Sequence, residues 1–331
     1  MRTAKHSPAG FTLIEMMVVV AIMGVVTAQL FTVFNNQKKV YASADRALDV
    51  QETARLTLDL ISFDTRMAGF MVPDYLAVSS VDGGKDHADR LCVSASPFSG
   101  KDAFLDPTLT KGNHFAGAAV SSVDGGGKVV LKSLDVDNDG QPDIGQGGAI
   151  IVASHTHTYC ARIANLDLGT LTVTFDVPGG ENPHDYLGDG DADMAAVPAN
   201  IYELNEGTSE LRRNTMLLGS QIEDFQVEYW LDNSGVPNGV EDGDAEFPVN
   251  NLNQPDPPGG AEVADNSQIR RVRVSVTSVT TRGDQSNSAT GHTGYGRPAL
   301  ANRVAGAPDL LRRRSFSASI LPRNILEESG T

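Results

Sequence analysis

The chain has 331 residues and a formal net charge of −16, from 26 Lys and Arg against 42 Asp and Glu. Beyond an anchor segment, this length suffices for one large domain or two small ones. The acidic balance argues against nucleic-acid binding, because contacts to phosphate need Lys and Arg. Acids in Gly- and Asn-rich loops instead favour cations or simply serve solubility.

A short basic leader precedes an apolar segment of bilayer length. Arg2 and Lys5 lie within residues 1–10, and residues 11–34 contain one charge, that of Glu15. As a helix, residues 11–34 would measure about 36 Å, which exceeds the roughly 30 Å core of a bilayer. The positive-inside rule places the leader in the cytoplasm and the bulk of the chain outside. Residues 11–34 are therefore predicted to be transmembrane.

The helical pattern continues past the apolar segment. Neither Gly nor Pro occurs between Asn35 and Arg66, and a stripe at alternating steps of four and three consists of Val40, Ala44, Ala47, Gln51, Ala54, Leu58 and Ile61. This spacing predicts one helix from about Phe11 to about Arg66, ending near Gly69. Residues 35–68 are expected to pack as an amphipathic helix on a globular head.

The head, residues 69–331, is predicted to consist of strands and long loops. Period-two alternation or short apolar runs mark strands near residues 129–131, 149–153, 171–175, 227–231, 272–276 and 316–320. Loops rich in Gly, Pro, Asp and Asn cover about 82–89, 181–193, 233–265 and 283–309. Such lengths mark functional or mobile insertions. The predicted fold class is α+β, with a long N-terminal helix packed on an antiparallel β-sheet head.

Residues 10–15 read Gly-Phe-Thr-Leu-Ile-Glu and resemble the class III signal of type IV pilins and pseudopilins. An ordinary secretory signal is cut after its apolar region, whereas this Gly-Phe junction precedes it. The resemblance implies that a prepilin peptidase cuts after Gly10 and that Phe11 is then methylated. It also implies that Glu15 draws the N-terminal amine of a neighbouring subunit and sets the axial register. The alternative is a glutamate near the lipid surface of a plain signal anchor, since an unpaired carboxylate inside an apolar helix is costly.

Later motifs resemble those of PilW-type minor pilins. Residues 64–70 are similar to the D-x-R-x-A-G-[FY] signature of that family, and residues 222–229 to its central strand. Residues 269–276 and 312–324 resemble its following strand and its C-terminal strand. The pseudopilins of the GspJ type share this architecture. Major pilins commonly carry a helix-kinking proline where this chain has Thr32.

The resemblance implies a type IV pilus minor pilin that helps to prime assembly and is not an enzyme. It would lie in the inner membrane with its head in the periplasm and later reach the cell surface in a pilus. Its implied partners are prepilin peptidase, the inner-membrane assembly platform, and other minor and major pilins. Two alternatives stay open: a minor pseudopilin of type II secretion, and a tip adhesin whose calcium-stabilised loops bind a surface or partner.

Residues 135–143 match the first nine positions of a calcium-binding loop, with glycine at the sixth. The predicted Ca²⁺ ligands are the carboxylates of Asp135, Asp137, Asp139 and Asp143 and the carbonyl of Gln141. Position twelve is Gln146 instead of the bidentate glutamate, and no flanking helices are evident. The pattern indicates an isolated calcium loop between strands, and the alternative is a solvated acidic turn.

The remaining candidates carry weaker patterns. Residues 189–193 alternate Asp with small residues and form a second, poorer candidate for a calcium loop. His155 and His157 form a candidate pair of metal ligands, and the alternative is that they are ordinary surface histidines. The triplet 312–314 is expected to pair with acids. An oxidising compartment would permit a disulfide between Cys92 and Cys160. The alternative is that the two cysteines are separate buried thiols, since sequence alone does not place them within bonding distance. No hydrolase, zinc-protease or phosphate-loop motif occurs, so no catalytic residue is assigned.

Overall fold

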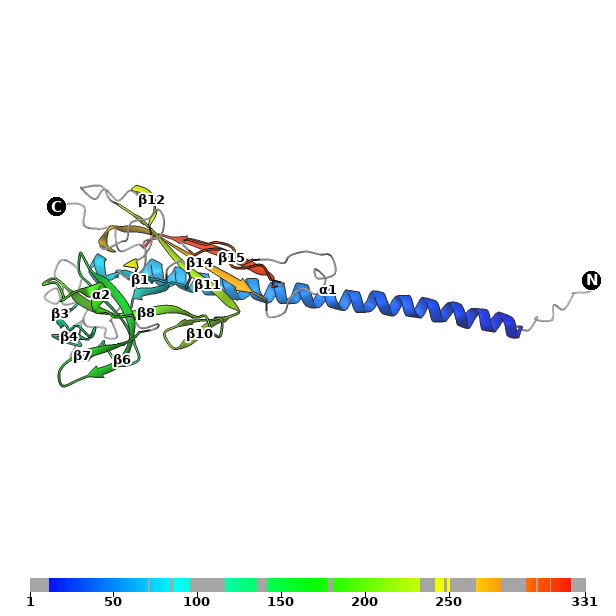
Figure 1. Ribbon diagram of the computed structural model, residues 1–331, viewed down its shortest axis with the longest axis horizontal. Helices are drawn as coiled ribbons and strands as arrows, with labels where there is room; N and C mark the ends of the chain where they lie inside the picture. The colour runs from blue at the N-terminus through cyan, green and yellow to red at the C-terminus, as the bar shows by residue number, and fades with distance from the viewer. Residues whose placement is uncertain are drawn as a thin grey trace, which may run out of the picture. The chain divides into compact units, whose positions relative to one another are not determined.

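The computed structural model describes residues 12–70, 72–83, 86–95, 117–135, 142–177, 181–232, 242–246, 249–250, 266–280, 296–301, 303–309 and 311–322. Its contacts divide the chain into two units, residues 1–49 and residues 50–331. Most of the first unit is helix, and the second unit contains every described strand (Figure 1).

The helix α1 (Leu13–Met67) is a single element of 55 residues, which confirms the predicted long N-terminal helix. It ends where predicted, because Gly69 adopts the left-handed φ of 76° that favours glycine after a helix. Its buried residues all lie within positions 50–65. Burial therefore begins part-way along the range 35–68 that the apolar stripe marked for packing.

The first sheet has eleven strands. They are β1 (Val78–Asp82), β2 (Arg90–Ser94), β3 (Ala118–Val123), β4 (Val129–Leu131), β5 (Ala149–Ala153), β6 (Thr158–Asp167), β7 (Thr172–Asp176), β8 (Ala195–Asn205), β9 (Glu210–Arg213), β10 (Met216–Ser220) and β13 (Val249–Asn250). Strand β8 is 11 residues long and pairs with β3 and β5 along its first part and with β2 and β9 farther on. The order β8-β3-β4-β7-β6-β5 thereby returns to β8 and closes a ring.

The second sheet has the order β12-β11-β14-β15, with β11 (Ile222–Leu231), β12 (Asp242–Glu246), β14 (Ile269–Val279) and β15 (Arg313–Ile320). Among the described strand pairs, only β1 with β13 is parallel. The α+β class with antiparallel pairing is thus confirmed, although two sheets form where one was expected. The short elements are η1 (Asp74–Leu76), α2 (His184–Leu187) and η4 (Asn266–Gln268).

Two hydrophobic clusters fill the second unit, and β2 contributes to both. Alternation along β2 places Cys92 in the cluster formed mainly by the strands of the ring, whereas Leu91 and Val93 join the cluster around the second sheet. The second cluster also contains Ala54 and Ile61 from α1, which packs there against strands such as β11 and β14. One strand therefore connects the ring to the helix-covered sheet.

Candidate functional site

The first turn of α1 forms a reciprocal cap that the sequence analysis missed. The Thr12 hydroxyl accepts a hydrogen bond from the Glu15 N–H at 3.3 Å, and Glu15 Oε2 accepts from the Thr12 N–H at 3.4 Å. A Thr followed three residues later by Glu is the signature of this capping box. Glu15 therefore stabilises the start of the helix. This contribution is separate from the pairing with a neighbouring subunit's N-terminal amine that the resemblance implies.

The helix beyond this cap meets the length and hydropathy of a membrane span. An apolar window of 18 residues in α1 contains no buried residue. Side chains such as Leu13 and Phe31 are 80% and 65% exposed. Gly10 and Phe11, the predicted processing residues, lie outside the described residues.

Asp64, from the signature in residues 64–70, joins α1 to the first sheet. Its Oδ2 accepts hydrogen bonds from the Tyr202 hydroxyl at 2.6 Å and from Arg213 Nε at 2.8 Å. Asp64 and Tyr202 are buried, so this charged contact is shielded from water. Asp64 therefore forms its hydrogen bonds inside the head and fixes α1 against β8 and β9.

Asp224, from the motif in residues 222–229, is the centre of a buried ion cluster. Its carboxylate accepts from Arg297 Nη1 at 3.0 Å and from Arg303 Nη1 at 2.7 Å, and it has no exposed surface. Nearby, Arg313, the middle residue of the triplet, pairs with Glu223 and with Asp309, as predicted for that one of the three arginines. These contacts hold Arg297 and Arg303 on β11.

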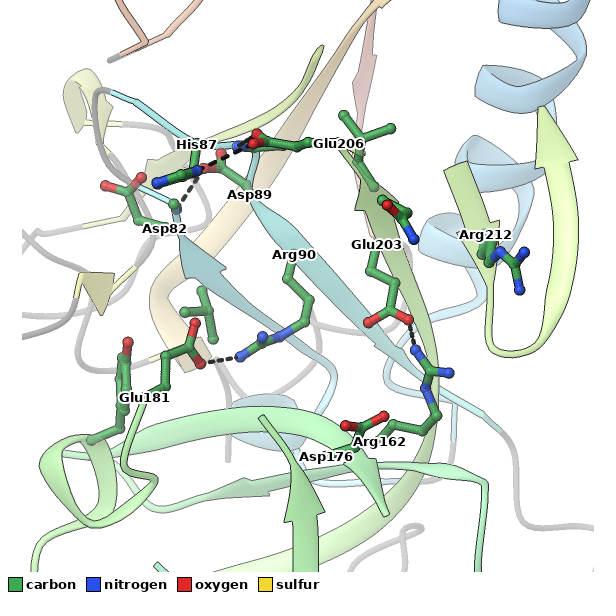
Figure 2. A pocket seen from close by; sticks show the side chains of 16 residues that line it. Asp82, His87, Asp89, Arg90, Arg162, Asp176, Glu181, Glu203, Glu206 and Arg212 are labelled. Atoms are coloured by element: carbon green, nitrogen blue, oxygen red, sulfur yellow. Dashed lines mark hydrogen bonds and ion pairs between the residues drawn. The ribbon is translucent and has the colours of Figure 1, made fainter. Parts of the chain in front are cut away.

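A pocket of about 730 Å³ opens in the second unit (Figure 2). It is lined by the end of β1, the start of β2, parts of β6, β7 and β8, and the segment around Glu181 and Tyr186. Its charged side chains come mainly in pairs. Arg90 Nη2 contacts Glu181 Oε2 at 2.8 Å, and Arg162 contacts Glu203. This pocket was not foreseen, since its residues come from distant strands without a common motif.

Two carboxyl groups meet in the wall of the pocket. Asp89 accepts hydrogen bonds from the N–H groups of Gly83 and Val227, at 3.0 and 2.7 Å, and a further hydrogen bond joins it to Asp82. Burial, and next the charge of Asp82, raise the pKa of Asp89 well above its usual value. Both side chains are buried, and the charge of Asp82 beside Asp89 disfavours the charged form of Asp89.

Tyr186 lies in the same pocket with a buried hydroxyl. Its residue is 4% exposed, and the hydroxyl has no hydrogen-bond partner among the described residues. Burial and then the charge of Glu181 raise the pKa of this phenol, which therefore stays protonated. A protonated, unpaired phenol at a pocket wall is a donor that lacks an acceptor.

Cys92 of β2 and Cys160 of β6 form a disulfide with a Cα–Cα distance of 6.2 Å. The bond connects β6 of the ring to β2, which pairs with β8 outside the ring, and leaves no free cysteine in the described part of the chain. A cross-link between residues 68 apart in sequence restricts the unfolded chain and stabilises the head by about 2–5 kcal/mol.

Most of the predicted calcium loop lies outside the described residues, including Asp137, Asp139 and Gln141. The flanks of the loop are described. The Leu134 carbonyl accepts from the Asp143 N–H at 2.9 Å, so the two described ends of the loop lie side by side. This closure brings Asp135 and Asp143 to the same end of the loop, and calcium binding there stays a prediction.

The histidines of the other candidate pair take separate partners. The His155 ring packs against Tyr75 at 4.7 Å between centroids, whereas His157 Nδ1 contacts Asp191 at 2.8 Å. Asp191 also accepts from Ser154 and Thr156. Within the described ranges, no three His, Cys, Asp or Glu residues are arranged to hold a metal ion.

Residues 5–28 match the family described as "Prokaryotic N-terminal methylation motif". The match covers the end of the leader and the first part of α1, so the chain carries a prepilin-type methylation motif. No curated protein matches the chain. Among solved structures, the chain is similar to a type IV-like pilin from Thermus thermophilus, with 10% identity, a TM-score of 0.34, and coverage of 84% of this chain and 97% of that one.

Proposed function

We propose that the protein is a type IV pilin-like subunit, processed at Gly10 and assembled through its N-terminal helix. The observation that carries this proposal is the position of the methylation motif on the helix. The motif covers residues 5–28, and the apolar window of α1 has no residue buried by the rest of the chain. Such a surface needs lipid or the helices of neighbouring subunits around it.

The minor-pilin role is the finer part of the proposal. A helix without a kink and a large head both favour a rare subunit over a repeating one. Helix α1 continues through Thr32, whose hydroxyl donates to the Ala28 carbonyl at 3.0 Å. The head would crowd a regular lattice. The subunit would then stand at one end of the filament, inserted first in the inner membrane with its head in the periplasm.

Glu15 provides the sharpest test, because its cap and its charge can be separated. Glu15→Gln keeps an acceptor for the Thr12 N–H but removes the charge, whereas Glu15→Ala removes both. Each variant would replace the chromosomal copy, and incorporation into sheared filaments would be measured by immunoblot. Both variants should insert in the membrane and be processed, and both should be absent from filaments. Glu52→Gln, an exposed carboxylate farther along α1, is the matched control.

The outcomes separate the proposed role from its rivals. Normal incorporation of Glu15→Gln with loss of Glu15→Ala would reduce Glu15 to a helix cap and refute the charge-pairing role.

Mass spectrometry should find Phe11 as the methylated N-terminus, and an intact Met1 leader in filaments would refute pilin processing. Deletion of the gene should abolish pili. Intact but non-adherent pili would indicate a tip adhesin, and a loss of protein export alone would indicate a pseudopilin of type II secretion.

A further inference from the structure

Strand β15 forms a long, regular edge of the second sheet. It pairs with β14 and with no other described strand (Figure 1), and its eight residues keep an unbroken register with β14. The other described edge strands are shorter or irregular. Strand β13 has two residues, and β10 and β12 have five residues each, with register shifts against their partners. Native sheets use short or bulged edges to prevent pairing with other chains, so β15 is the edge left open to it.

The hydrogen bonds to β14 show which backbone groups of β15 face outward. The Thr280 N–H donates to the Arg312 carbonyl at 3.0 Å, and the Ser278 hydroxyl donates to the Arg314 carbonyl at 3.2 Å. In an antiparallel pair, alternate residues turn both backbone groups to the partner strand. The even-numbered residues of β15 therefore face β14, and the odd-numbered residues present their N–H and C=O groups to the free edge.

Three serines make up the accessible part of this edge. Ser315, Ser317 and Ser319 are all exposed, and no described residue forms a hydrogen bond with their backbone N–H or C=O groups. The side chains leave the edge uncovered. The Ser315 hydroxyl is 2.8 Å from that of Thr277, and the Ser317 hydroxyl is 2.8 Å from that of Ser275, so both point back over β14. The edge thus has a row of backbone donors and acceptors that an added strand could pair with.

Positive charge lies on the face of β15 that packs toward α1. Arg314 and Phe316 share this face because they are two residues apart, and the Arg55 guanidinium lies 5.7 Å from the centre of the Phe316 ring. Both arginines are exposed, and neither forms an ion pair with a described acid. The exposed Asp59 lies one turn along α1 from Arg55, so Arg314 is the charge that an added strand would meet most directly. An acidic side chain would be attracted there.

We propose that β15 binds an extended, acidic segment of another polypeptide, which adds to the second sheet as an antiparallel strand. The three serines would supply three N–H donors and three C=O acceptors along about 13 Å of strand. A carboxylate of the added strand would lie beside Arg314, and small apolar side chains would lie beside Phe316 and Ala318. The proposal concerns residues 50–331 and does not depend on assembly through the first part of α1.

The test is fluorescence anisotropy with two labelled, amidated peptides and the full chain in detergent micelles. The first peptide is Thr-Val-Thr-Val-Thr-Glu-Thr, which places threonines beside the three serines and its glutamate beside Arg314. The second has lysine in place of glutamate. The glutamate peptide should bind at least about threefold more tightly, because the lysine peptide would bring like charges together.

A proline with a matched alanine control identifies the backbone edge. Ser317→Pro removes an N–H that faces outward, so it leaves the hydrogen bonds to β14 in place and should weaken the glutamate peptide at least about tenfold. Ser317→Ala loses the same hydroxyl contact with Ser275 but keeps the N–H, and it should bind as the wild type does. Ser319→Pro and Ser319→Ala repeat the comparison nearer the strand end, which keeps the test valid if Ser317→Pro lowers the melting temperature.

A second comparison tests the selection for acid. Arg314→Ala should bind the glutamate and lysine peptides equally. Lys128→Ala, which removes an exposed charge beside β4 in the first sheet, should keep the wild-type preference. A preference that survives Arg314→Ala would show that this arginine does not select the partner.

Four results would overturn the proposal. Equal binding by the folded proline and alanine variants would place the peptide elsewhere. Binding that appears only after residues 323–331 are removed would indicate that the chain's own end occupies the edge. Wild-type dimers in sedimentation that dissociate in Ser317→Pro would identify a second copy of this chain as the occupant. No change in anisotropy with either peptide at submillimolar protein would refute strand addition at β15.

Discussion

The first and last parts of α1 belong to one continuous helix but differ in how far their apolar side chains are buried. In residues 13–34 the large apolar side chains are exposed, whereas in residues 50–67 Ala54 and Ile61 have no exposed surface. Local hydrogen bonds form both parts, so secondary structure does not distinguish them. The difference shows that the rest of the chain leaves the apolar surface of the first part uncovered and buries that of the second part.

The largest expected effect comes from the buried ions of the head. Asp224→Ala should lower the free energy of unfolding by about 3–5 kcal/mol, because Arg297 and Arg303 would lose their buried partner. Denaturant titration of the full chain in micelles, followed by the fluorescence of Trp230, the single tryptophan, measures it. Asp59→Ala is the exposed control. A loss no larger than that of the control would mean that the cluster contributes nothing net to stability.

A pair of truncations in α1 tests the comparison directly. Ile61→Ala should destabilise the head by about 2–5 kcal/mol, since it empties a packed site in the second hydrophobic cluster. Leu30→Ala, in the same helix, should change the unfolding of the head by less than about 0.5 kcal/mol, because that side chain is 64% exposed. The same titration measures both. Equal effects would show that the two parts of α1 share one folding unit.

Calcium should stabilise the head and leave α1 unaffected. An ion that binds only the folded protein at a hundredfold excess over its Kd adds about 2.7 kcal/mol. Chelation should therefore lower the melting temperature of the full chain, and Asp137→Ala should abolish the difference. Magnesium should replace calcium poorly, because its smaller octahedral shell fits such a loop badly. Identical melting with and without chelator, and no calorimetric binding at millimolar calcium, would leave residues 135–143 as a solvated turn.

The smallest expected effect is a pH dependence at Asp191. Hydrogen bonds from Thr156, then Ser154 and His157, lower the pKa of this carboxyl from 3.8 to about 2. Its folded pKa is below its unfolded pKa, so its contribution to stability is complete above pH 3.8 and is lost as the pH falls to 2. Between pH 5 and pH 2 the wild type should lose more stability than Asp191→Asn. Parallel losses would show that the hydrogen bonds do not favour the charged form.

The strands that were predicted correctly are those whose pattern is local. The run 149–153 became β5 because five consecutive apolar residues are buried, and the alternation at 272–276 lies within β14. Strand β8 was missed. It contains Pro198 and several alanines, which have low strand propensity. Its pairing with four other strands outweighs that propensity, and no window of sequence contains this information.

The sequence by itself determined the span, the methylation motif and the single long helix. Each depends on residues within a few turns of one another, through hydrogen bonds from i to i−4 and through apolar length. Tertiary structure alone decided that Asp64 would meet Tyr202, that Asp82 and Asp89 would share a pocket wall, and that Tyr186 would lack a partner. Asp64 and Tyr202 are 138 positions apart, and so are Asp89 and Val227, whose N–H donates to the Asp89 carboxylate, so these contacts form only when distant elements pack together.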